Sequence, residues 1–211
     1  MGTGPGTGIR RVEPDDEKAV ETAVRLLDEA FQDDPVSSWV FPDPARRREV
    51  HRHLMRAFLE ISLAEGHVDL TEDGTATALW IDVPAEPEEG DGPEEGDGED
   101  GPAQLRAAVD PDNERVEQIG RLTGAVHPHG RAHTYLLLIA VAPDRQSRGA
   151  GAALIAPVLE RCDREGLPAY LEASSARSSV LYERLGFVHL DEPLRLPDGP
   201  LMYPMWREPR G

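Results

Sequence analysis

Residues 133–151 read HTYLLLIAVAPDRQSRGAG and carry most of the information about the fold. The apolar run at residues 134–142 is typical of a central strand that is buried on both faces. Gly149 and Gly151 follow in a short loop that opens directly into an apolar-faced helix. Because glycine has no Cβ and the first amides of a helix are unpaired, this unit predicts a site for an anion such as a pyrophosphate.

Two other nucleotide-binding loops do not fit this stretch. A Walker A loop needs Lys and then Ser or Thr after its last glycine, whereas Ala152 and Ala153 stand there. A Rossmann fingerprint needs a third glycine, and Leu154 occupies its place. A strand–helix turn that uses glycine only for tightness stays open at this point.

The rest of the chain predicts an α/β arrangement. Apolar patterns predict strands at residues 9–12, 67–71, 75–83, 133–142, 169–173, 187–196 and 201–207. Apolar residues at three- and four-residue spacing predict helices that begin at Asp15 or Asp16, after residues 41–44, at about residue 103, after Gly151 and at Arg177. The third of these is expected to run as one helix over residues 103–122.

One segment differs in composition from everything around it. Residues 86–101 contain only Glu, Asp, Gly and Pro. Such a segment has no apolar side chain to bury, so we expect a disordered acidic insertion. We therefore expect a flexible N-terminus at residues 1–8, a single domain at residues 9–207 and a C-terminal tail at residues 208–211.

The overall composition excludes several classes of partner. The formal net charge of -18 argues against nucleic acid, because phosphates would be repelled. No run of 18 apolar residues predicts a membrane span, and the first residues do not resemble a signal peptide. With Cys162 as the one cysteine, no internal disulfide can form, and we expect a cytoplasmic protein.

Three histidines near the central strand raise the question of a metal site. His127, His129 and His133 have no carboxylate or cysteine at ligand spacing, and Pro128 constrains their loop. We therefore expect no metal, and we interpret these residues as surface histidines.

Two motifs resemble those of a known enzyme family. Val141-x-Pro143 followed by Gln146-x-x-Gly149-x-Gly151 resembles the acetyl-CoA signature of the GNAT superfamily, and residues 181–187 (LYERLGF) resemble its C-terminal motif. Within that superfamily the chain is most similar to the puromycin N-acetyltransferase-like group, over residues 9–207 with the acidic segment as an insertion.

The resemblance implies a fold and a cofactor. It implies the α/β GNAT fold, with a mixed, mostly antiparallel sheet of about seven strands and helices on both faces. It implies acetyl-CoA as co-substrate and no metal. The residues that it assigns to the cofactor are Ile139, Ala140, Val141, Gln146, Ser147, Arg148, Gly149, Ala150, Gly151, Ala152 and Ser178.

The same resemblance implies catalytic roles. Tyr182 would protonate the leaving thiolate as general acid, although it can also be a core tyrosine beside Phe187. The N–H of Val141 would polarise the acetyl carbonyl. Many GNAT enzymes carry a glutamate on the central strand, but residues 134–141 contain no carboxylate, so Glu172 and His133 are the candidates for a general base.

The acceptor is the least determined part. We expect a primary amine of a small molecule, an antibiotic or a metabolite, bound by a monomer or homodimer. Its expected contacts are Phe31, Asp34, Trp39 and Trp80, with Phe41, Tyr203 and Trp206 as further candidates. A protein α-amine or lysine acceptor stays open. So does a degenerate, non-catalytic acyl-CoA-binding domain, because Ser175 and Ser178 stand where GNAT proteins often carry asparagine.

Overall fold

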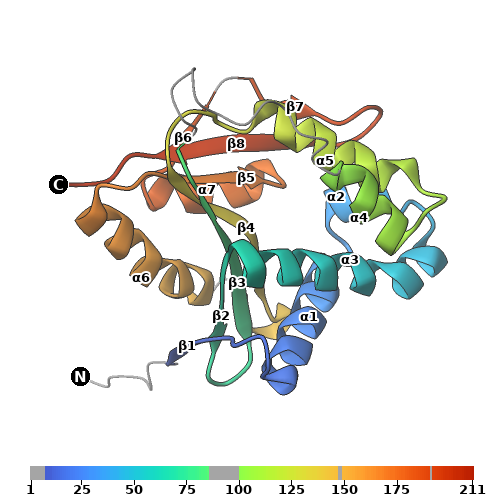
Figure 1. Ribbon diagram of the computed structural model, residues 1–211, viewed down its shortest axis with the longest axis horizontal. Helices are drawn as coiled ribbons and strands as arrows, with labels where there is room; N and C mark the ends of the chain where they lie inside the picture. The colour runs from blue at the N-terminus through green and yellow to red at the C-terminus, as the bar shows by residue number, and fades with distance from the viewer. Residues whose placement is uncertain (1–7, 86–99, 147–148, 191) are drawn as a thin grey trace.

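The computed structural model describes residues 8–85, 100–146, 149–190 and 192–211, which form an α/β domain around one sheet (Figure 1). The sheet has eight strands in the order β1-β2-β3-β4-β5-β8-β6, and β7 also pairs with β8. The strands are β1 (Ile9–Arg11), β2 (Gly66–Thr71), β3 (Ala76–Val83), β4 (His133–Val141), β5 (Ala169–Ala173), β6 (Val188–His189), β7 (Leu194–Arg195) and β8 (Leu201–Arg207). Among the strand pairs of the described residues only β4–β5 is parallel. The prediction of a mixed, mostly antiparallel sheet is confirmed.

Helices connect these strands, and the first three helices begin at aspartate caps. The helices are α1 (Glu17–Phe31), α2 (Pro35–Val40), α3 (Pro44–Glu65), α4 (Gly101–Val109), α5 (Glu114–Val126), α6 (Ala150–Glu165) and α7 (Ala176–Arg184). Asp16 caps α1, Asp34 caps α2 and Asp43 caps α3, each by accepting hydrogen bonds from amides of the first turn. These bonds satisfy amides that have no intrahelical partner.

Two apolar cores lie on opposite faces of the sheet. Leu27 of α1 and Leu59 of α3 pack on one face with Leu79 of β3. Ile155 of α6 packs on the other face with Trp80 of β3. Because successive side chains of a strand point to opposite faces, the neighbours Leu79 and Trp80 show that helices cover both faces. Figure 1 shows α1 and α6 on the two sides of β2 and β3.

The central strands separate partway along their length. β4 pairs with β5 at Thr134↔Ala169 and Tyr135↔Tyr170, whereas β3 stays paired with β4 as far as Val141. Beyond Tyr135, the edge of β4 that faces β5 has no strand partner within the described residues. The register between β3 and β4 also shifts beside Leu79, which is the kind of irregularity that bends a strand. The two strands therefore open into a V toward the end of β4.

Two element predictions were wrong. The helix expected at residues 103–122 is two helices, α4 and α5, because Pro111 lies in the turn that separates them. The strand expected at residues 187–196 is two short strands, β6 and β7, which both pair with β8. In addition, residues 35–40 form the short helix α2, for which no helix was predicted; Asp34 caps it and Pro35 stands at its first position.

Some residues of the segments expected to lie outside the fold belong to it. Residues 1–7 and 86–99 lie outside the described residues. The last two residues of the expected acidic insertion are not a disordered segment, because Asp100 caps α4 and Gly101 begins it. At the C-terminus, Glu208 accepts hydrogen bonds from Arg131, so the tail contacts the domain. No helix in the described ranges is long and apolar enough to cross a membrane.

Candidate active site

A cavity of about 400 Å³ lies where β4 and β5 separate. Its floor is the open edge of β4 together with the end of β5, and α7 contributes Tyr182 and Ser178. α1 and α2 contribute Phe31, Asp34 and Ser37. The cavity therefore joins the segment that resembles an acetyl-CoA site to helices from the first third of the chain.

The open edge of β4 presents free backbone groups to this cavity. Ile139, Ala140 and Val141 all line it. The N–H of Ala142 donates to Thr75 O at 2.8 Å, on the β3 side of β4. Because alternate N–H groups of a strand point to opposite edges, the N–H of Val141 points toward the V, as expected for a group that polarises a carbonyl there.

The loop after β4 has the backbone geometry that its glycines predict. Gly149 is the N-cap residue of α6 and has φ 85°, a left-handed conformation that favours glycine. Gly151 packs against β4: a Cβ added there would lie 3.7 Å from Ile139 Cδ1 and from Val141 Cγ2. The N-terminus of α6 thus lies directly beside the open edge of β4.

The first turn of α6 suits a phosphate-containing ligand. Ala153 N–H makes the first bond of the helix, to Gly149 O, so the amides of Ala150, Gly151 and Ala152 have no intrahelical partner. Such amides carry partial positive charge and point toward an incoming anion. Gln146 lines the cavity and donates to Val141 O at 3.1 Å. Ser147 and Arg148 lie outside the described residues.

Ser178 lies at the cavity with its hydroxyl already engaged. Ser175 and Ser178 form a capping box at the start of α7: each hydroxyl accepts from the other residue's amide, at 3.1 and 3.2 Å. Ser178 Oγ also donates to Ser175 O at 2.9 Å. A contact of Ser178 with the cofactor would therefore have to share this hydroxyl with the cap.

Glu172 is the central carboxylate of the site. It accepts hydrogen bonds from the hydroxyl groups of Tyr135, at 2.7 Å, and Tyr170, at 2.9 Å. Burial raises the pKa of Glu172 to about 7, against the opposing effect of these two hydrogen bonds. A carboxylate with this pKa takes up and releases a proton near neutral pH, which is what a general base requires.

Tyr182 reaches the cavity from the opposite face of the sheet. Its ring packs edge-on against Phe187, with the centroids 6.0 Å apart, in the core under α6 and α7. Glu172 lies between Leu171 and Ala173, which belong to that same core, so the Glu172 side chain points to the α1–α3 face. Both residues line the cavity. The V between β4 and β5 thus brings together two groups that a continuous sheet would keep apart.

Tyr182 is protonated at neutral pH. Burial raises its pKa to about 12, since no described residue donates to or accepts from its hydroxyl to offset the loss of hydration. Its ring belongs to the core and the residue also lines the cavity, so the core position expected as one alternative does not remove it from the site. Its role as general acid stays a prediction.

His133 is not a candidate base, and the histidines of this region are not all surface residues. His133 is 1% exposed, and the structure does not place it at the cavity. Its Nδ1 bonds to Arg131 O at 2.8 Å, so its Nε2 accepts from His127 Nε2 at 3.0 Å. Burial lowers the pKa of His127 to about 4 and also lowers that of His133. These two rings pack neutral behind Tyr170.

Several expected acceptor contacts were wrong. Phe31 and Asp34 line the cavity as expected. Trp39 does not, because its Nε1 donates to Pro197 O at 2.7 Å and its ring is buried beside α5. Trp80 does not, because strand alternation places it in the core under α6, fully buried. The further aromatic candidates outside the cavity are Phe41, Tyr203 and Trp206.

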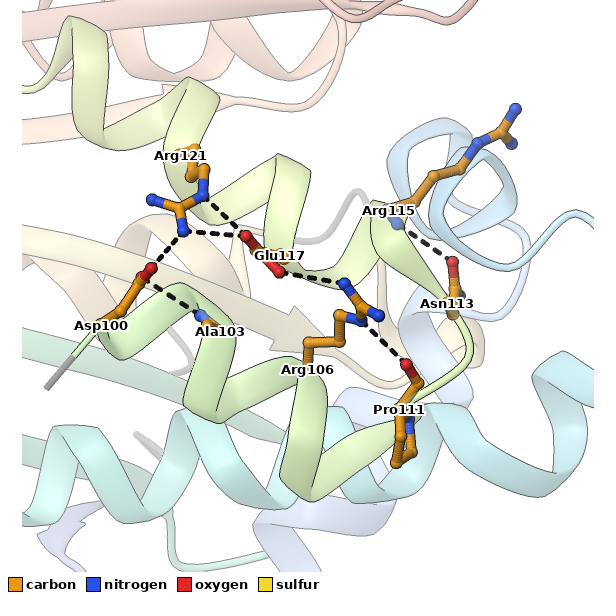
Figure 2. Close-up of polar contacts among 8 residues, drawn as sticks. All are labelled: Asp100, Ala103, Arg106, Pro111, Asn113, Arg115, Glu117 and Arg121. Atoms are coloured by element: carbon orange, nitrogen blue, oxygen red, sulfur yellow. Dashed lines mark hydrogen bonds and ion pairs between the residues drawn. The ribbon is translucent and has the colours of Figure 1, made fainter.

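The α4–α5 hairpin forms a wall that the sequence did not predict. Leu105 of α4 and Ile119 of α5 line the cavity. Figure 2 shows α4 and α5 joined by the ion pairs Arg106–Glu117, at 3.2 Å, and Asp100–Arg121. Glu117 also pairs with Arg121 within α5, at 2.8 Å. The sequence of α4 and α5 shows the Arg and Glu residues that form these pairs. It does not show that the two helices fold back on each other at Pro111 and reach the cavity.

The described residues were also compared with the requirements of a metal site. No group of three or more His, Cys, Asp and Glu side chains in these ranges is placed to hold a metal ion. The polar side chains that line the cavity include the carboxylates of Asp34 and Glu172, the phenols of Tyr135 and Tyr182, and several serine hydroxyls. Carboxylates and phenols are groups that can accept and donate protons in acyl transfer.

Comparison with known proteins agrees with this geometry. Residues 105–208 match the model of the acetyltransferase (GNAT) domain. An uncharacterized N-acetyltransferase of Schizosaccharomyces pombe is 42% identical over 55 residues, which span 26% of this chain and 22% of the relative. The aligned stretch is therefore a small part of that protein.

Solved structures match over nearly the whole chain. A crystal structure described as histone acetyltransferase HPA2 and related acetyltransferase, from Corynebacterium glutamicum, is 25% identical with a TM-score of 0.67, covering 96% of each chain. Arylalkylamine N-acetyltransferase 2 from Aedes aegypti is 14% identical with a TM-score of 0.56, covering 95% of this chain and 99% of the other. The second likeness concerns the fold alone. The chain adopts the GNAT fold, and its residues 105–208 match the acetyltransferase (GNAT) domain.

Proposed function

We propose that this protein transfers the acetyl group of acetyl-CoA to a primary amine of a small molecule, by direct attack of the amine on the thioester. The observation that carries the proposal is the meeting of Glu172, Tyr182 and the open edge of β4 in one cavity. Each of the three supplies a different requirement of the reaction. Gln146 and Ser178, which the resemblance assigns to the cofactor, line the same cavity.

The side chains divide the proton transfers between them. Glu172 accepts the proton that the attacking amine loses as its nitrogen bonds to the acetyl carbon. Tyr182 donates its proton to the sulfur as the carbon–sulfur bond breaks. The Val141 N–H, which points into the V, stabilises the charge on the carbonyl oxygen. Acetyl-CoA supplies the activated acetyl group, and the amides of the first turn of α6 would hold its pyrophosphate.

The shape of the cavity supports a small acceptor. Part of its lining is apolar: Leu54 and Phe58 of α3, Leu105 of α4 and Ile119 of α5. An amine on a compact apolar body fits such a space. This supports the antibiotic- or metabolite-type acceptors of the puromycin N-acetyltransferase-like group over an extended protein substrate. A cytoplasmic location and a monomeric or homodimeric state stay predictions from the sequence.

A turnover assay tests this function. Purified protein is mixed with acetyl-CoA and a panel of small primary amines, and thiol release and acetylated products are measured together. The account expects amine-dependent thiol release, with Glu172→Gln strongly impaired and the exposed Glu160→Gln on α6 unaffected as the matched control. Acetylation of peptide amines but of no small amine would favour a protein acceptor. Binding of acetyl-CoA without turnover on either panel would favour a non-catalytic domain.

A further inference from the structure

The residues at the start of α2 form a second polar part of the cavity, apart from Glu172 and the cofactor segment. Asp34 Oδ1 accepts from the amides of Val36, at 2.8 Å, and Ser37, at 3.4 Å. Its other oxygen, Oδ2, accepts from the Ser174 hydroxyl at 2.8 Å. Asp34, Ser37 and Ser174 all line the cavity. One carboxylate thus joins α2 to the segment that follows β5.

Ser37 is held with its oxygen free to accept. Its Oγ lies 3.0 Å from Nε2 of His51, whose Nδ1 lies 2.7 Å from Oδ1 of Asp28. A carboxylate only accepts, so Nδ1 carries a proton and donates it to Asp28. His51 is fully buried and burial lowers its pKa, so the ring is neutral and Nε2 accepts the proton of Ser37. The hydroxyl proton is thereby used, and only lone pairs remain to face the cavity.

The order Asp28–His51–Ser37 is also that of a nucleophilic triad, but the surroundings do not support that chemistry. A serine nucleophile needs nearby amide N–H groups that stabilise an oxyanion. The amides of Val36 and Ser37 bond to the Asp34 side chain, and that of Ser38 bonds to Asp34 O at 2.9 Å. With these amides occupied, Ser37 is placed to accept a hydrogen bond from a ligand.

The charges around the cavity favour a cationic ligand at this end. Among its described lining residues, the charged ones are Asp34 and Glu172, and both are acidic. No basic side chain of the described residues forms an ion pair with Asp34. A carboxylate that is partly withdrawn from water gains most from a cation with hydrogen-bond donors, which an ammonium group provides.

The two acidic groups belong to neighbouring parts of the cavity wall. Ser174 follows Glu172 by two residues, so their Cα atoms lie at most about 7 Å apart. Asp34 accepts a hydrogen bond from Ser174 and therefore lies on the Ser174 side of Glu172. A ligand that contacts both carboxylates therefore needs two amines several bonds apart.

We propose that Asp34 and Ser37 form a subsite for a second ammonium group of the acceptor, while Glu172 faces the amine that is acetylated. This inference rests on the proposed function and narrows its substrate class to diamines and to amines with a second basic nitrogen. The apolar walls between the two ends contact the body of the ligand.

A matched pair of substrates tests the subsite. Cadaverine and n-hexylamine have the same number of heavy atoms, and one terminal ammonium replaces one methyl. The wild-type protein is expected to prefer cadaverine in kcat/KM. Asp34→Asn keeps a helix-capping oxygen but removes the charge, and should lower the cadaverine-to-hexylamine ratio about 10- to 100-fold, the range for a lost charge-assisted hydrogen bond. Ser37→Ala should lower the same ratio.

The control and a second readout separate this inference from the proposed function. Asp33→Asn makes the same charge change one residue away, at an exposed position outside the cavity, and should leave the ratio unchanged. Calorimetric binding of cadaverine to the CoA-loaded protein should weaken in Asp34→Asn even if neither amine is acetylated, a result that would sink the proposed function alone. Acetylation of both amines with a ratio that Asp34→Asn does not alter would overturn the subsite. So would cadaverine binding that is equal in the wild type and in Asp34→Asn.

Discussion

The hydroxyl of Tyr135 donates a 2.7 Å hydrogen bond to Glu172, across the last paired position of β4 and β5. Beyond this pair the strands separate and the cavity begins. Tyr135 therefore fixes the carboxylate at the apex of the V, with Tyr170 on its other oxygen. The position of the proposed base therefore depends on where β4 and β5 separate.

The raised pKa of Glu172 makes a prediction about stability. Its folded pKa of about 7 lies above the ordinary value of 4.5, so its contribution is present at acid pH and lost as pH rises through about 7. Between about pH 5 and about pH 8, the wild type should lose about 2 to 3 kcal/mol of unfolding free energy relative to Glu172→Gln, which does not titrate. Urea unfolding of both proteins at the two pH values measures this. A difference that does not change with pH would show that Glu172 is not buried as described.

Tyr182→Phe should separate catalysis from packing. The ring and its contact with Phe187 remain, so the thermal midpoint and acetyl-CoA affinity should change little. Loss of the proton donor should lower kcat by about 10²- to 10⁴-fold. Tyr203→Phe on β8, which does not line the cavity, is the matched control. Unimpaired kcat in Tyr182→Phe would assign proton donation to another group, such as water.

Gly149→Asp should abolish cofactor binding. Acetyl-CoA at about 100 times its Kd should stabilise the wild type by about 3 kcal/mol, measured as a rise in thermal midpoint. An aspartate at φ 85° would strain the backbone and place a negative charge at the N-terminus of α6. Gly149→Ala tests the backbone effect alone and should retain part of the shift. An undiminished shift in Gly149→Asp would place the cofactor elsewhere.

Deleting residues 86–99 should leave acetyl-CoA binding intact, provided that Asp100 is kept. Asp100 caps α4 and pairs with Arg121 of α5, so it belongs to the hairpin that walls the cavity (Figure 2). A short Gly/Ser linker in place of the acidic residues should preserve the thermal midpoint. Asp100→Ala in the full chain should lower it. Impaired acetyl-CoA binding in the deletion would show that the acidic run has a role in the site.

The cofactor side of the site was predictable because it depends on local sequence. The apolar run of β4 and the glycines after it specify a strand, a tight loop and a helix N-terminus within 19 consecutive residues, 133–151. The left-handed conformation of Gly149 and the contact of Gly151 with β4 follow from that order. Contacts among residues this close in sequence depend little on how the rest of the chain folds.

The acceptor side was less predictable because it depends on contacts between distant segments. Trp80 is an aromatic residue on the strand next to β4. Because side chains alternate along β3, it points into the core under α6, on the other face of the sheet from Phe31 and Asp34. Ser37 and His51 come together only when α2 and α3 pack, and no spacing in the sequence indicates it.

Pro111 is a helix-breaking residue that the expectation of one helix over residues 103–122 did not use. The position of the resulting hairpin also depends on contacts such as that of Arg115 on α5 with Trp39 O on α2.

The pH dependence of kcat/KM in the wild type and in Glu172→Gln tests the central claim most directly. With acetyl-CoA and an accepted amine, the wild-type rate should rise with pH through an apparent pKa near 7, because only the deprotonated carboxylate accepts the proton of the amine. The substrate amine has a higher pKa, so the rise of kcat/KM near pH 7 reports the titration of an enzyme group. Glu172→Gln should lower kcat by about 10²- to 10⁴-fold and remove the limb. A Glu172→Gln enzyme with the wild-type rate and the same pH profile would contradict the assignment of Glu172 as the base.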